Sequence, residues 1–467
     1  MSAAATHRLA LGMDVSTAEV RVTVLDLDAA IEVAGAATAL PAVTGTGGLR
    51  VQDVDYALLA RTVIDEALSD HVGDQVVAIS ITATSGTVVP IDSMGRQSGI
   101  AVMYDDARGL PFERLLPQGK GRPISMLGRI MALAAAHGDF RAASVAQVIG
   151  TVLVGHEVGG DTSHFLKTGI DPSETAWPGE LLADARLRDD VLPVLVQPGT
   201  TLGSVVDGAA GGALLVAGMT DGCTSQLASG AVRNGQSVGV LGTTLVLKSV
   251  AAVDHWDAAT GIYAHRAPDG AYWLGGASNV GGGSVQKPDG LDYAEAEHRA
   301  RALGPSPIVR YPLARRGERF PVADAEFEAF AIDLDGSSSG RVPAVVTYRA
   351  GLEGVAMVER LALETLGLDA SASPRVLSGG GTRNRLWNEI RAATLGAVVR
   401  IPTHGDSGYG AAVLAGWAAG DEPFAEVVDR FTKGGELIDP DPELTVAMAE
   451  RYAVFTAALA SARGSHR

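Results

Sequence analysis

Two short segments of similar sequence lie about half a chain apart, and a run of β-branched and apolar residues follows each. The first is 11–17 (LGMDVST) and the second is 240–246 (VLGTTLV). Glycine lets the backbone turn tightly and brings amide N–H groups against an anion, and neighbouring Ser and Thr hydroxyls add donors. Because 20–27 and 245–250 have the composition of strands, each segment predicts a strand, a tight turn and a strand. The chain therefore looks like one phosphate-holding hairpin used twice.

The length of 467 residues exceeds what one ordinary core fills and predicts two or three domains. Hydrophobic residues make up 46% of the chain and charged residues 19%, which is typical of a globular α/β protein and not of a disordered one. The net charge of −17 argues against duplex nucleic acid as a partner. An anionic ligand would therefore have to be held by local amide groups and a metal ion.

Cysteine and histidine usage excludes two common kinds of cross-link. The single cysteine, Cys223, allows no intramolecular disulfide and favours a reducing compartment; we interpret it as a small buried residue at a helix start. The ten histidines lack the spacing of zinc ligands, so no structural zinc is predicted. Residues 1–7 do not have the pattern of a secretory signal, and no apolar run reaches the ~18 residues that a membrane span needs. We expect a cytoplasmic protein that contacts no membrane.

Short apolar runs and longer helical patterns alternate, which predicts an α/β fold in two similarly built halves. In the first half we expect strands at 8–13, 21–27, 31–38, 76–81 and 213–218, and helices at 54–68, within 124–158 and at 223–231. In the second half we expect strands at 238–241, 245–250, 376–377, 398–401 and around Tyr263 and Trp273, and helices at 342–366, 384–395, 410–419 and 442–460. Asp53 is the expected N-cap of the helix at 54–68. A polar turn at 233–235 divides the chain into domains 1–233 and 234–467, with a ligand cleft between them.

Two aspartates stand where chemistry can occur. Asp14 lies in the first hairpin turn, where it either bonds its own backbone or, beside a phosphate cradle, holds a hydrated Mg²⁺. Asp221 follows a buried strand and precedes a helix. It either caps that helix by accepting the amides of Thr224 or nearby residues, or acts as the general base that takes a proton from a substrate hydroxyl attacking phosphorus.

Three further segments carry polar groups after strands. Residues 378–384 (SGGGTRN) permit close approach of a ring or a phosphate, and Asn384 either bonds a nucleoside or caps the next helix. This is not the G-x-G-x-x-G of a dinucleotide site, and the chain has no Walker sequence, so a Rossmann dehydrogenase is disfavoured. Residues 104–108 (YDDAR) form either a surface ion-pair cluster or a wall for a substrate with several hydroxyls. Ser85 is either a hydroxyl contact or a turn residue.

Taken together, these features resemble the FGGY family of carbohydrate kinases, of the actin-like, ribonuclease-H-like ATPase superfamily, over nearly the whole chain. The resemblance is carried by 12–17 (GMDVST), 104–108 (YDDAR), 220–222 (TDG), 241–244 (LGTT), 352–354 (LEG), 378–381 (SGGG) and 410–412 (GAA). Similarity to the short D-ribulose kinases is carried by 84–88 (TSGTV), 166–169 (LKTG), 261–266 (GIYAHR), 275–279 (GGASN) and 311–321 (YPLARRGERFP). The resemblance to the FGGY family implies two actin-like domains with a central cleft, and ATP and Mg²⁺ as cofactors.

The resemblance also implies a role for each matching residue. Asp221 would be the catalytic base, and Asp14 would hold Mg²⁺ through water, with Asp221 nearby. The residues expected to hold the ketose are Ser85, Asp14, Asp106 and Asp221. Those expected to bind the phosphates are Ser16, Thr17, Gly242, Thr243 and Thr244, and those of the adenine pocket are Gly379, Gly380, Gly381, Asn384 and Trp387. Two departures concern the sugar: the family's Trp-Asn-Asp-x-Arg is YDDAR here, and the Lys-x-x-Trp of xylulokinases is not evident at 125–133.

We therefore predict ATP-dependent phosphorylation of a terminal hydroxyl of a pentulose, with D-ribulose expected and D-xylulose or another ketose or polyol as the alternative. A different class of function, an actin-like protein switched by nucleotide without catalysis, would not need Asp221 or the 104–108 cluster. A repressor built on the same fold would need a basic helix-turn-helix extension, which the chain lacks. The expected partners are a sugar and ATP, and a homodimer is allowed.

Overall fold

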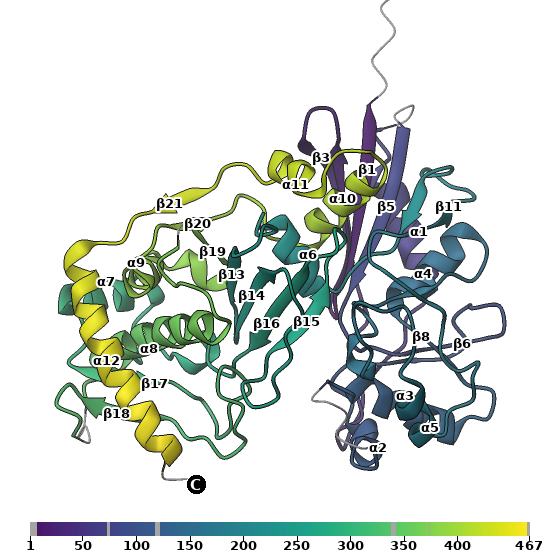
Figure 1. Ribbon diagram of the computed structural model, residues 1–467. Helices are drawn as coiled ribbons and strands as arrows, with labels where there is room; N and C mark the ends of the chain where they lie inside the picture. The colour runs from purple at the N-terminus through teal and green to yellow at the C-terminus, as the bar shows by residue number, and fades with distance from the viewer. Residues whose placement is uncertain (1–6, 72–74, 117–121, 338–341, 373, 465–467) are drawn as a thin grey trace, which may run out of the picture. The chain divides into compact units, whose positions relative to one another are not determined.

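The computed structural model describes residues 7–71, 75–116, 122–337, 342–372 and 374–464. The chain forms two compact units (Figure 1). Unit 1 comprises Met1–Gly230, His265–Trp273 and His404–Lys433, and unit 2 comprises Ala231–Ala264, Leu274–Thr403 and Gly434–Arg467. The predicted sequence domains 1–233 and 234–467 stay a prediction.

Unit 1 is built on a six-stranded sheet with the order β11-β12-β5-β1-β2-β3. Its strands are β1 (Arg8–Val15), β2 (Glu19–Asp26), β3 (Ile31–Ala39), β5 (Gln75–Ala83), β11 (Thr201–Ser204) and β12 (Leu214–Val216). The strands β1, β5 and β12 are parallel to one another, whereas β2, β3 and β11 run antiparallel to their neighbours. Three carboxyl ends of strands therefore meet at one edge of this sheet.

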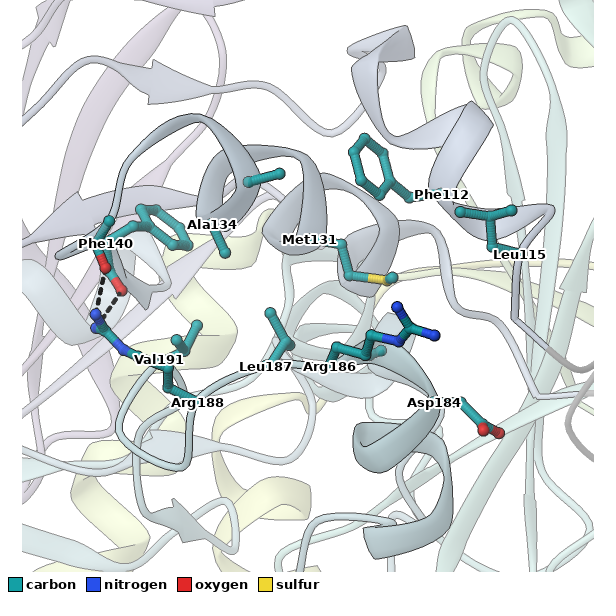
Figure 2. A pocket seen from close by; sticks show the side chains of 13 residues that line it. Phe112, Leu115, Met131, Ala134, Phe140, Asp184, Arg186, Leu187, Arg188 and Val191 are labelled. Carbon is teal, nitrogen blue, oxygen red and sulfur yellow. Dashed lines mark hydrogen bonds between the residues drawn. The ribbon is translucent and has the colours of Figure 1, made fainter.

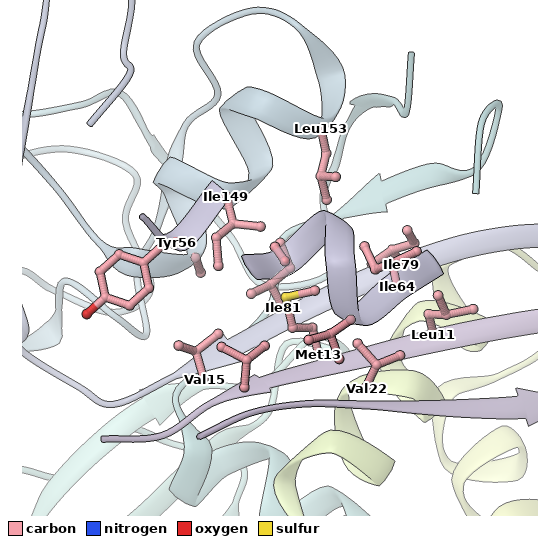
Figure 3. Close-up of a cluster of buried hydrophobic side chains, with 14 of the residues drawn as sticks. Leu11, Met13, Val15, Val22, Tyr56, Ile64, Ile79, Ile81, Ile149 and Leu153 are labelled. Carbon is pink, nitrogen blue, oxygen red and sulfur yellow. The ribbon is translucent and has the colours of Figure 1, made fainter. Parts of the chain in front are cut away.

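The two faces of β1 have different neighbours because side chains alternate along a strand. Leu11, Met13 and Val15 pack with α1 (Tyr56–Ala67) and α4 (Val145–Val154) in the main hydrophobic core of unit 1 (Figure 3). On the other face, a Cβ at Gly12 would lie 1.9 Å from the carbonyl oxygen of Gly408. Helix α10 (Ser407–Ala418) can therefore pack directly on β1 only because residue 12 is glycine, and Asp14 shares that face.

Unit 2 is built on a seven-stranded sheet with the order β15-β16-β14-β13-β19-β20-β21. Its strands are β13 (Ser237–Leu241), β14 (Leu245–Ala251), β15 (Tyr263–Arg266), β16 (Tyr272–Ala277), β19 (Arg375–Ser378), β20 (Val399–Ile401) and β21 (Glu436–Ile438). As in unit 1, an antiparallel hairpin (β13–β14) is followed in the sheet by parallel strands, here β19 and β20. The helices of this unit are α7 (Tyr293–Leu303), α8 (Ala344–Thr365), α9 (Arg385–Leu395) and α12 (Pro442–Gly464).

Smaller elements complete the units. The strand pairs are β4 (Val51–Gln52) with β7 (Ala101–Val102), β6 (Val89–Ile91) with β8 (Arg141–Ala143), β9 (Gly160–Asp161) with β10 (Leu195–Val196), and β17 (Ile308–Tyr311) with β18 (Phe330–Asp333). The remaining helices are α2 (Leu110–Glu113), α3 (Ser125–Ala136), α5 (Gly179–Ala185), α6 (Asp221–Ala228) and α11 (Phe424–Phe431). Among the described residues, no helix is both long and apolar enough to cross a lipid bilayer.

The expected α/β class and the repeated hairpins are confirmed, and three details are corrected. The N-cap of α1 is Asp55, whose side chain accepts the amide of Leu58, so the prediction of Asp53 is wrong. The helical pattern expected within 124–158 is interrupted by β8, which pairs with β6. Helix α6 begins at Asp221, two residues before the expected start.

Candidate functional site

The aspartates singled out in the sequence meet at the carboxyl edge of the unit 1 sheet. Asp14 is paired with Thr82 where β1 and β5 run side by side, and Ala83 at the end of β5 bridges to Thr220. Ser85 follows β5, and Asp221 directly follows Thr220. The parallel topology thus brings Asp14, Ser85 and Asp221, which are far apart in sequence, to one edge.

Asp14 lies within strand β1, opposite Arg21 of β2, so the prediction that it sits in the turn is wrong. Its Oδ2 accepts a hydrogen bond of 3.0 Å from the hydroxyl of Ser407, at the start of α10. Its Oδ1 is buried and has no hydrogen-bond partner among the described residues. Burial raises the pKa of Asp14 to about 6; the carboxylates of Asp221 and Asp406 also raise it, and the Ser407 bond opposes them. One carboxylate oxygen is therefore directed by the protein and the other is left for a ligand.

Asp221 is the first residue of α6, and Thr220 occupies the N-cap position. The Asp221 carboxylate accepts the amide N–H of Gly222 at 2.6 Å, not that of Thr224. The hydroxyl of Thr224 instead bonds Thr82 of β5 at 3.0 Å, which ties α6 to the central strand. The N-cap position is therefore held by Thr220 and not by Asp221, although Asp221 Oδ1 bonds one nearby amide of the first turn, as the capping interpretation allows; the other oxygen of this half-buried carboxylate is left for other chemistry.

Ser85 and Asp106 differ in how much of their bonding capacity is already used. Ser85 is half-buried in the turn after β5. The Asp106 side chain is fully buried and accepts bonds from Arg108 Nε (2.8 Å), Arg108 Nη2 (3.0 Å) and the amide of Arg50 (2.5 Å). Burial raises the pKa of Asp106, but these donors outweigh it and hold the pKa below its usual range. Asp106 thus has the contacts of an ion-pair residue, and its role in sugar binding stays a prediction.

The first hairpin turn is closed by its own side chain. The Ser16 hydroxyl accepts the amides of Ala18 (3.2 Å) and Glu19 (3.0 Å) and donates to the carbonyl of Glu19. The carbonyl of Thr17 accepts a bond from the side chain of Gln52. Contacts of Ser16 and Thr17 with phosphate stay a prediction.

Unit 2 contains a cavity of about 780 Å³, within the range of small-molecule sites. Six of the residues predicted from the sequence line it: Gly242, Thr243, Gly380, Gly381, Asn384 and Trp387. Thr244 and Gly379 are not among its lining residues. The lining also includes residues that the sequence reasoning missed, namely Gly282, Gly283, Val285, Tyr293, Ala294, Glu297, Tyr348 and Arg383. One sequence signal could have identified Gly282 and Gly283, namely the run of three glycines at 281–283.

Glycines in two segments, 281–283 and 379–381, let the backbone approach the second hairpin closely. A Cβ at Gly281 would lie 2.5 Å from Cα of Thr244, and a Cβ at Gly283 would lie 2.7 Å from Thr243 Cγ2. Gly379 has a left-handed φ of +84° and packs against Leu241. The turn is therefore surrounded by backbone, while Gly242 and Thr243 themselves remain exposed. The amide of Gly242 donates to the carbonyl of Thr244 at 3.0 Å, so an anion at this turn would be held by the amide and the hydroxyl of the exposed Thr243.

Asn384 and Trp387 sit at the start of α9, beside the glycine run. Asn384 is the N-cap: its Oδ1 accepts the amide of Trp387 at 2.8 Å, which confirms the capping interpretation. Its Nδ2 donates to the hydroxyl of Tyr348 at 3.2 Å. The Trp387 indole N–H donates to the carbonyl of Leu352, which fixes the ring at the wall of the cavity. A rigid aromatic wall beside an anion-binding turn suits a nucleotide.

A second cavity, of about 680 Å³, lies in unit 1 between α2, α3 and the segment after α5 (Figure 2). Its wall is largely apolar, with Met131 and Leu187 facing it and Arg186 and Arg188 along one side. Its described lining includes none of the residues predicted from the sequence. We therefore separate it from the candidate site.

Within the described ranges, no group of three or more His, Cys, Asp or Glu side chains is arranged to hold a metal ion. Mg²⁺ keeps several waters and is usually bound by one or two carboxylates together with substrate phosphates. The unpartnered Asp14 Oδ1 fits such a site, in which the phosphates and water supply the remaining ligands.

Comparisons with known proteins agree on one kind of enzyme. Residues 224–419 match the model of the FGGY family of carbohydrate kinases, C-terminal domain. The autoinducer-2 kinase of Escherichia coli (strain K12) is 27% identical over 360 residues, which cover 70% of this chain and 67% of that protein.

Solved structures show the same fold over nearly the whole chain. The xylulose kinase from Rhodospirillum rubrum superposes with a TM-score of 0.83 at 22% identity, covering 98% of this chain and 100% of that one. The gluconate kinase from Lactobacillus acidophilus gives a TM-score of 0.82 at 18% identity, with 99% and 100% covered. These likenesses establish the actin-like, ribonuclease-H-like α/β fold.

Proposed function

We propose that this chain is an ATP-dependent carbohydrate kinase of the kind that the FGGY family describes, and that its acceptor is a pentulose, with D-ribulose as the expected sugar. The observation that carries the proposal is the meeting of Asp14, Ser85 and Asp221 at one sheet edge, with a partner-free oxygen on Asp14. The choice of D-ribulose rests on the similarity of 84–88 and 166–169 to the short D-ribulose kinases.

Asp221 is proposed as the general base. As the terminal hydroxyl oxygen of the sugar attacks the γ-phosphorus, the O–H bond breaks, the proton passes to the Asp221 carboxylate and ADP leaves. Because Thr220 holds the N-cap position of α6, one oxygen of the Asp221 carboxylate is available for this step. Ser85 is proposed to orient the sugar by a hydrogen bond.

The nucleotide is proposed to occupy the unit 2 cavity, with its base between the glycine run at 379–381 and Trp387. The exposed turn of Gly242 and Thr243 would then hold the phosphates. Mg²⁺ bound near Asp14 would supply charge neutralisation on the phosphoryl oxygens. Asp14 would hold this ion through water by Oδ1, the oxygen that Ser407 leaves free. The cytoplasm remains the expected compartment.

A substrate screen tests the proposal. ATP consumption would be measured with D-ribulose, D-xylulose, L-ribulose, glycerol, gluconate, several sugar alcohols and the autoinducer-2 precursor, with the Asp221→Asn variant as the background. We expect kcat/KM for D-ribulose to exceed that for glycerol and gluconate by about 10² or more, because unpaired polar groups in a site reject an analogue that cannot bond them. Highest activity on the autoinducer-2 precursor, or on glycerol alone, would overturn the pentulose assignment. Filaments that depend on ATP, with no sugar phosphorylated, would favour the non-catalytic class.

A further inference from the structure

A short buried segment of unit 1 contacts both backbone stretches that carry the proposed sugar-side residues. This tether segment, 161–167 (DTSHFLK), begins in β9 and ends in a 3₁₀ turn. Its polar side chains are almost entirely buried over the first four residues: Asp161 is 4% exposed, Ser163 2% and His164 1%. Buried polar groups are costly unless they are bonded, so their partners show what the segment holds.

Ser163 bonds the segment between β12 and α6 that leads to the proposed base. The amide N–H of Thr220 donates to Ser163 Oγ at 3.1 Å, and the Ser163 and Thr220 hydroxyls lie 3.3 Å apart. Thr220 is the N-cap residue of α6 and immediately precedes Asp221. The position of Asp221 therefore depends on a bond between Ser163 and the neighbouring backbone.

His164 holds the strand end that leads to Ser85. The amide N–H of Ala83, the last residue of β5, donates to His164 Nε2 at 3.1 Å. Because an amide N–H can only donate, Nε2 must be the acceptor, which places the proton of the neutral ring on Nδ1. Nδ1 then donates to Asp161 Oδ2 at 2.5 Å, and Asp161 Oδ1 accepts the amide of His164 at 2.8 Å. Asp161 thereby fixes both the tautomer and the orientation of the ring.

Lys167 contacts the sugar-side turn directly. Its Nζ donates to the carbonyl of Ser85 at 3.3 Å. One residue further on, the buried Arg129 donates from Nε and Nη2 to the carbonyl of Gly86, at 3.3 and 3.1 Å. Gly86 has a left-handed φ of +90°, a backbone conformation that favours glycine. Lys167 and Arg129 therefore stabilise this turn through its backbone carbonyls.

We propose that the tether segment is a positioning element for phosphoryl transfer: Ser163 sets the place of Asp221, and His164 and Lys167 set the place of Ser85. None of the three needs to touch the substrate. Catalysis is sensitive to displacements of about 1 Å, so a segment that bonds both stretches controls the separation on which the reaction depends. The inference rests on the proposed function, since it takes Asp221 as the base and Ser85 as the sugar contact.

Two variants separate the two ends of the tether. Ser163→Ala is expected to lower kcat about tenfold with the KM for ATP unchanged, because the base loses its support. Lys167→Met is expected to raise the KM for the sugar about tenfold, and Lys167→Arg to stay within about threefold of the parent because it restores a donor. The matched controls are Ser173→Ala, at an exposed serine ten residues away, and Lys433→Met, at an exposed lysine of the same unit. Neither control should change a kinetic constant.

Hydrogen exchange supplies a readout that does not depend on the sugar. In Ser163→Ala the amide of Thr220 should exchange at least about tenfold faster, and in Lys167→Met exchange should rise in 84–87, with thermal midpoints close to that of the parent. Hydrogen exchange and kinetic constants equal to those of the parent in both variants would overturn the proposed positioning role of the tether segment. An equal loss in kcat, sugar affinity and ATP affinity, with a lowered thermal midpoint, would also overturn it by showing general destabilisation. Faster exchange in a protein that phosphorylates no pentulose would leave the tether standing and overturn the proposed function.

Discussion

Each unit places the turn of a similar hairpin at the carboxyl ends of its parallel strands, but the two hairpins carry different chemical groups. Counting from the last residue pair of each hairpin, Val15–Val20 in unit 1 and Leu241–Leu245 in unit 2, Val240 holds the position in β13 that Asp14 holds in β1. The unit 1 edge carries carboxylates, whereas the turn of unit 2 has no acidic side chain and exposes the hydroxyl of Thr243. A carboxylate is useful where a proton or a hydrated cation must be handled, and it would repel the phosphates where they are bound.

The turns themselves differ in the same sense. The hydroxyl of Ser16 is already hydrogen-bonded within the first turn. The carboxylate of Asp14, two residues earlier, is therefore the side chain of that hairpin with an oxygen left for a ligand. The second turn leaves Gly242 and Thr243 exposed, and the glycines at 281–283 pack against it from outside. The two hairpins share a frame, and the difference between them supports the proposal that unit 1 handles the proton and the metal and that unit 2 holds the phosphates.

The strongest way to break this comparison is to neutralise the base. Asp221→Asn is expected to lower kcat by about 10²-fold or more, the scale for losing a general base, while ADP affinity stays within about twofold because the nucleotide groups belong to unit 2. Steady-state kinetics and calorimetric titration with ADP measure the two effects. An Asn variant that retains activity would remove Asp221 from the mechanism, and a variant that loses ADP binding would contradict the separation of roles.

The second prediction concerns the cost of keeping an acid in the first hairpin. The pKa of Asp14 is about 6 in the folded protein against 3.8 when unperturbed, so the folded state binds the proton more tightly than the unfolded state does. The free energy of unfolding therefore falls as the pH rises from about 4 to about 6, and the loss is complete above that window. Asp14→Asn should be more stable than the parent by roughly 2 kcal/mol at pH 8, since each unit of pKa shift is worth about 1.4 kcal/mol and partial exposure reduces the sum.

Urea unfolding without Mg²⁺ or nucleotide, at pH 8 and near pH 4, measures this difference, which should vanish at the lower pH. The matched control is Asp28→Asn, at an exposed aspartate just beyond β2, which should change the free energy of unfolding by less than about 0.5 kcal/mol. A destabilised Asp14→Asn protein at pH 8 would show that the carboxylate is compensated by partners in the folded state.

The residues at the carboxyl edge of the unit 1 sheet could be predicted from the sequence, because each can be placed from its own strand once the strands are parallel. Asp14 lies near the end of β1 and Asp221 follows β12 at the start of α6; both strands have a clear apolar run, and strands of one direction end on one side. The sequence reasoning missed α7, whose only buried residues are Ala296 and Ala300, since two small side chains give little amphipathic signal.

Other features could not be read from one segment at a time. The role of Gly281 depends on how closely the backbone of Thr244 approaches it, and that of His164 depends on the amide of Ala83, 81 residues earlier. Asp55 rather than Asp53 caps α1, a choice between two suitable residues that local pattern does not decide. For Gly281 and His164 a tertiary contact decides the role, whereas the N-cap bond of Asp55 is local and the sequence offers two suitable aspartates.

The smallest expected effects come from exchanging one hydroxyl in each turn, and they sharpen the comparison most directly. Ser16→Ala should lower the free energy of unfolding by about 1 kcal/mol, because the amides of Ala18 and Glu19 lose their acceptor, and should leave the KM for ATP unchanged. Thr243→Val should leave stability unchanged, since the side chain is exposed, and raise the KM for ATP about fivefold by removing one donor to the phosphates. Urea unfolding and ATP titration of both variants measure this crossed pattern. If Ser16→Ala raised the KM for ATP as much as Thr243→Val does, both turns would hold phosphate and the roles of the two hairpins would be shared, not divided.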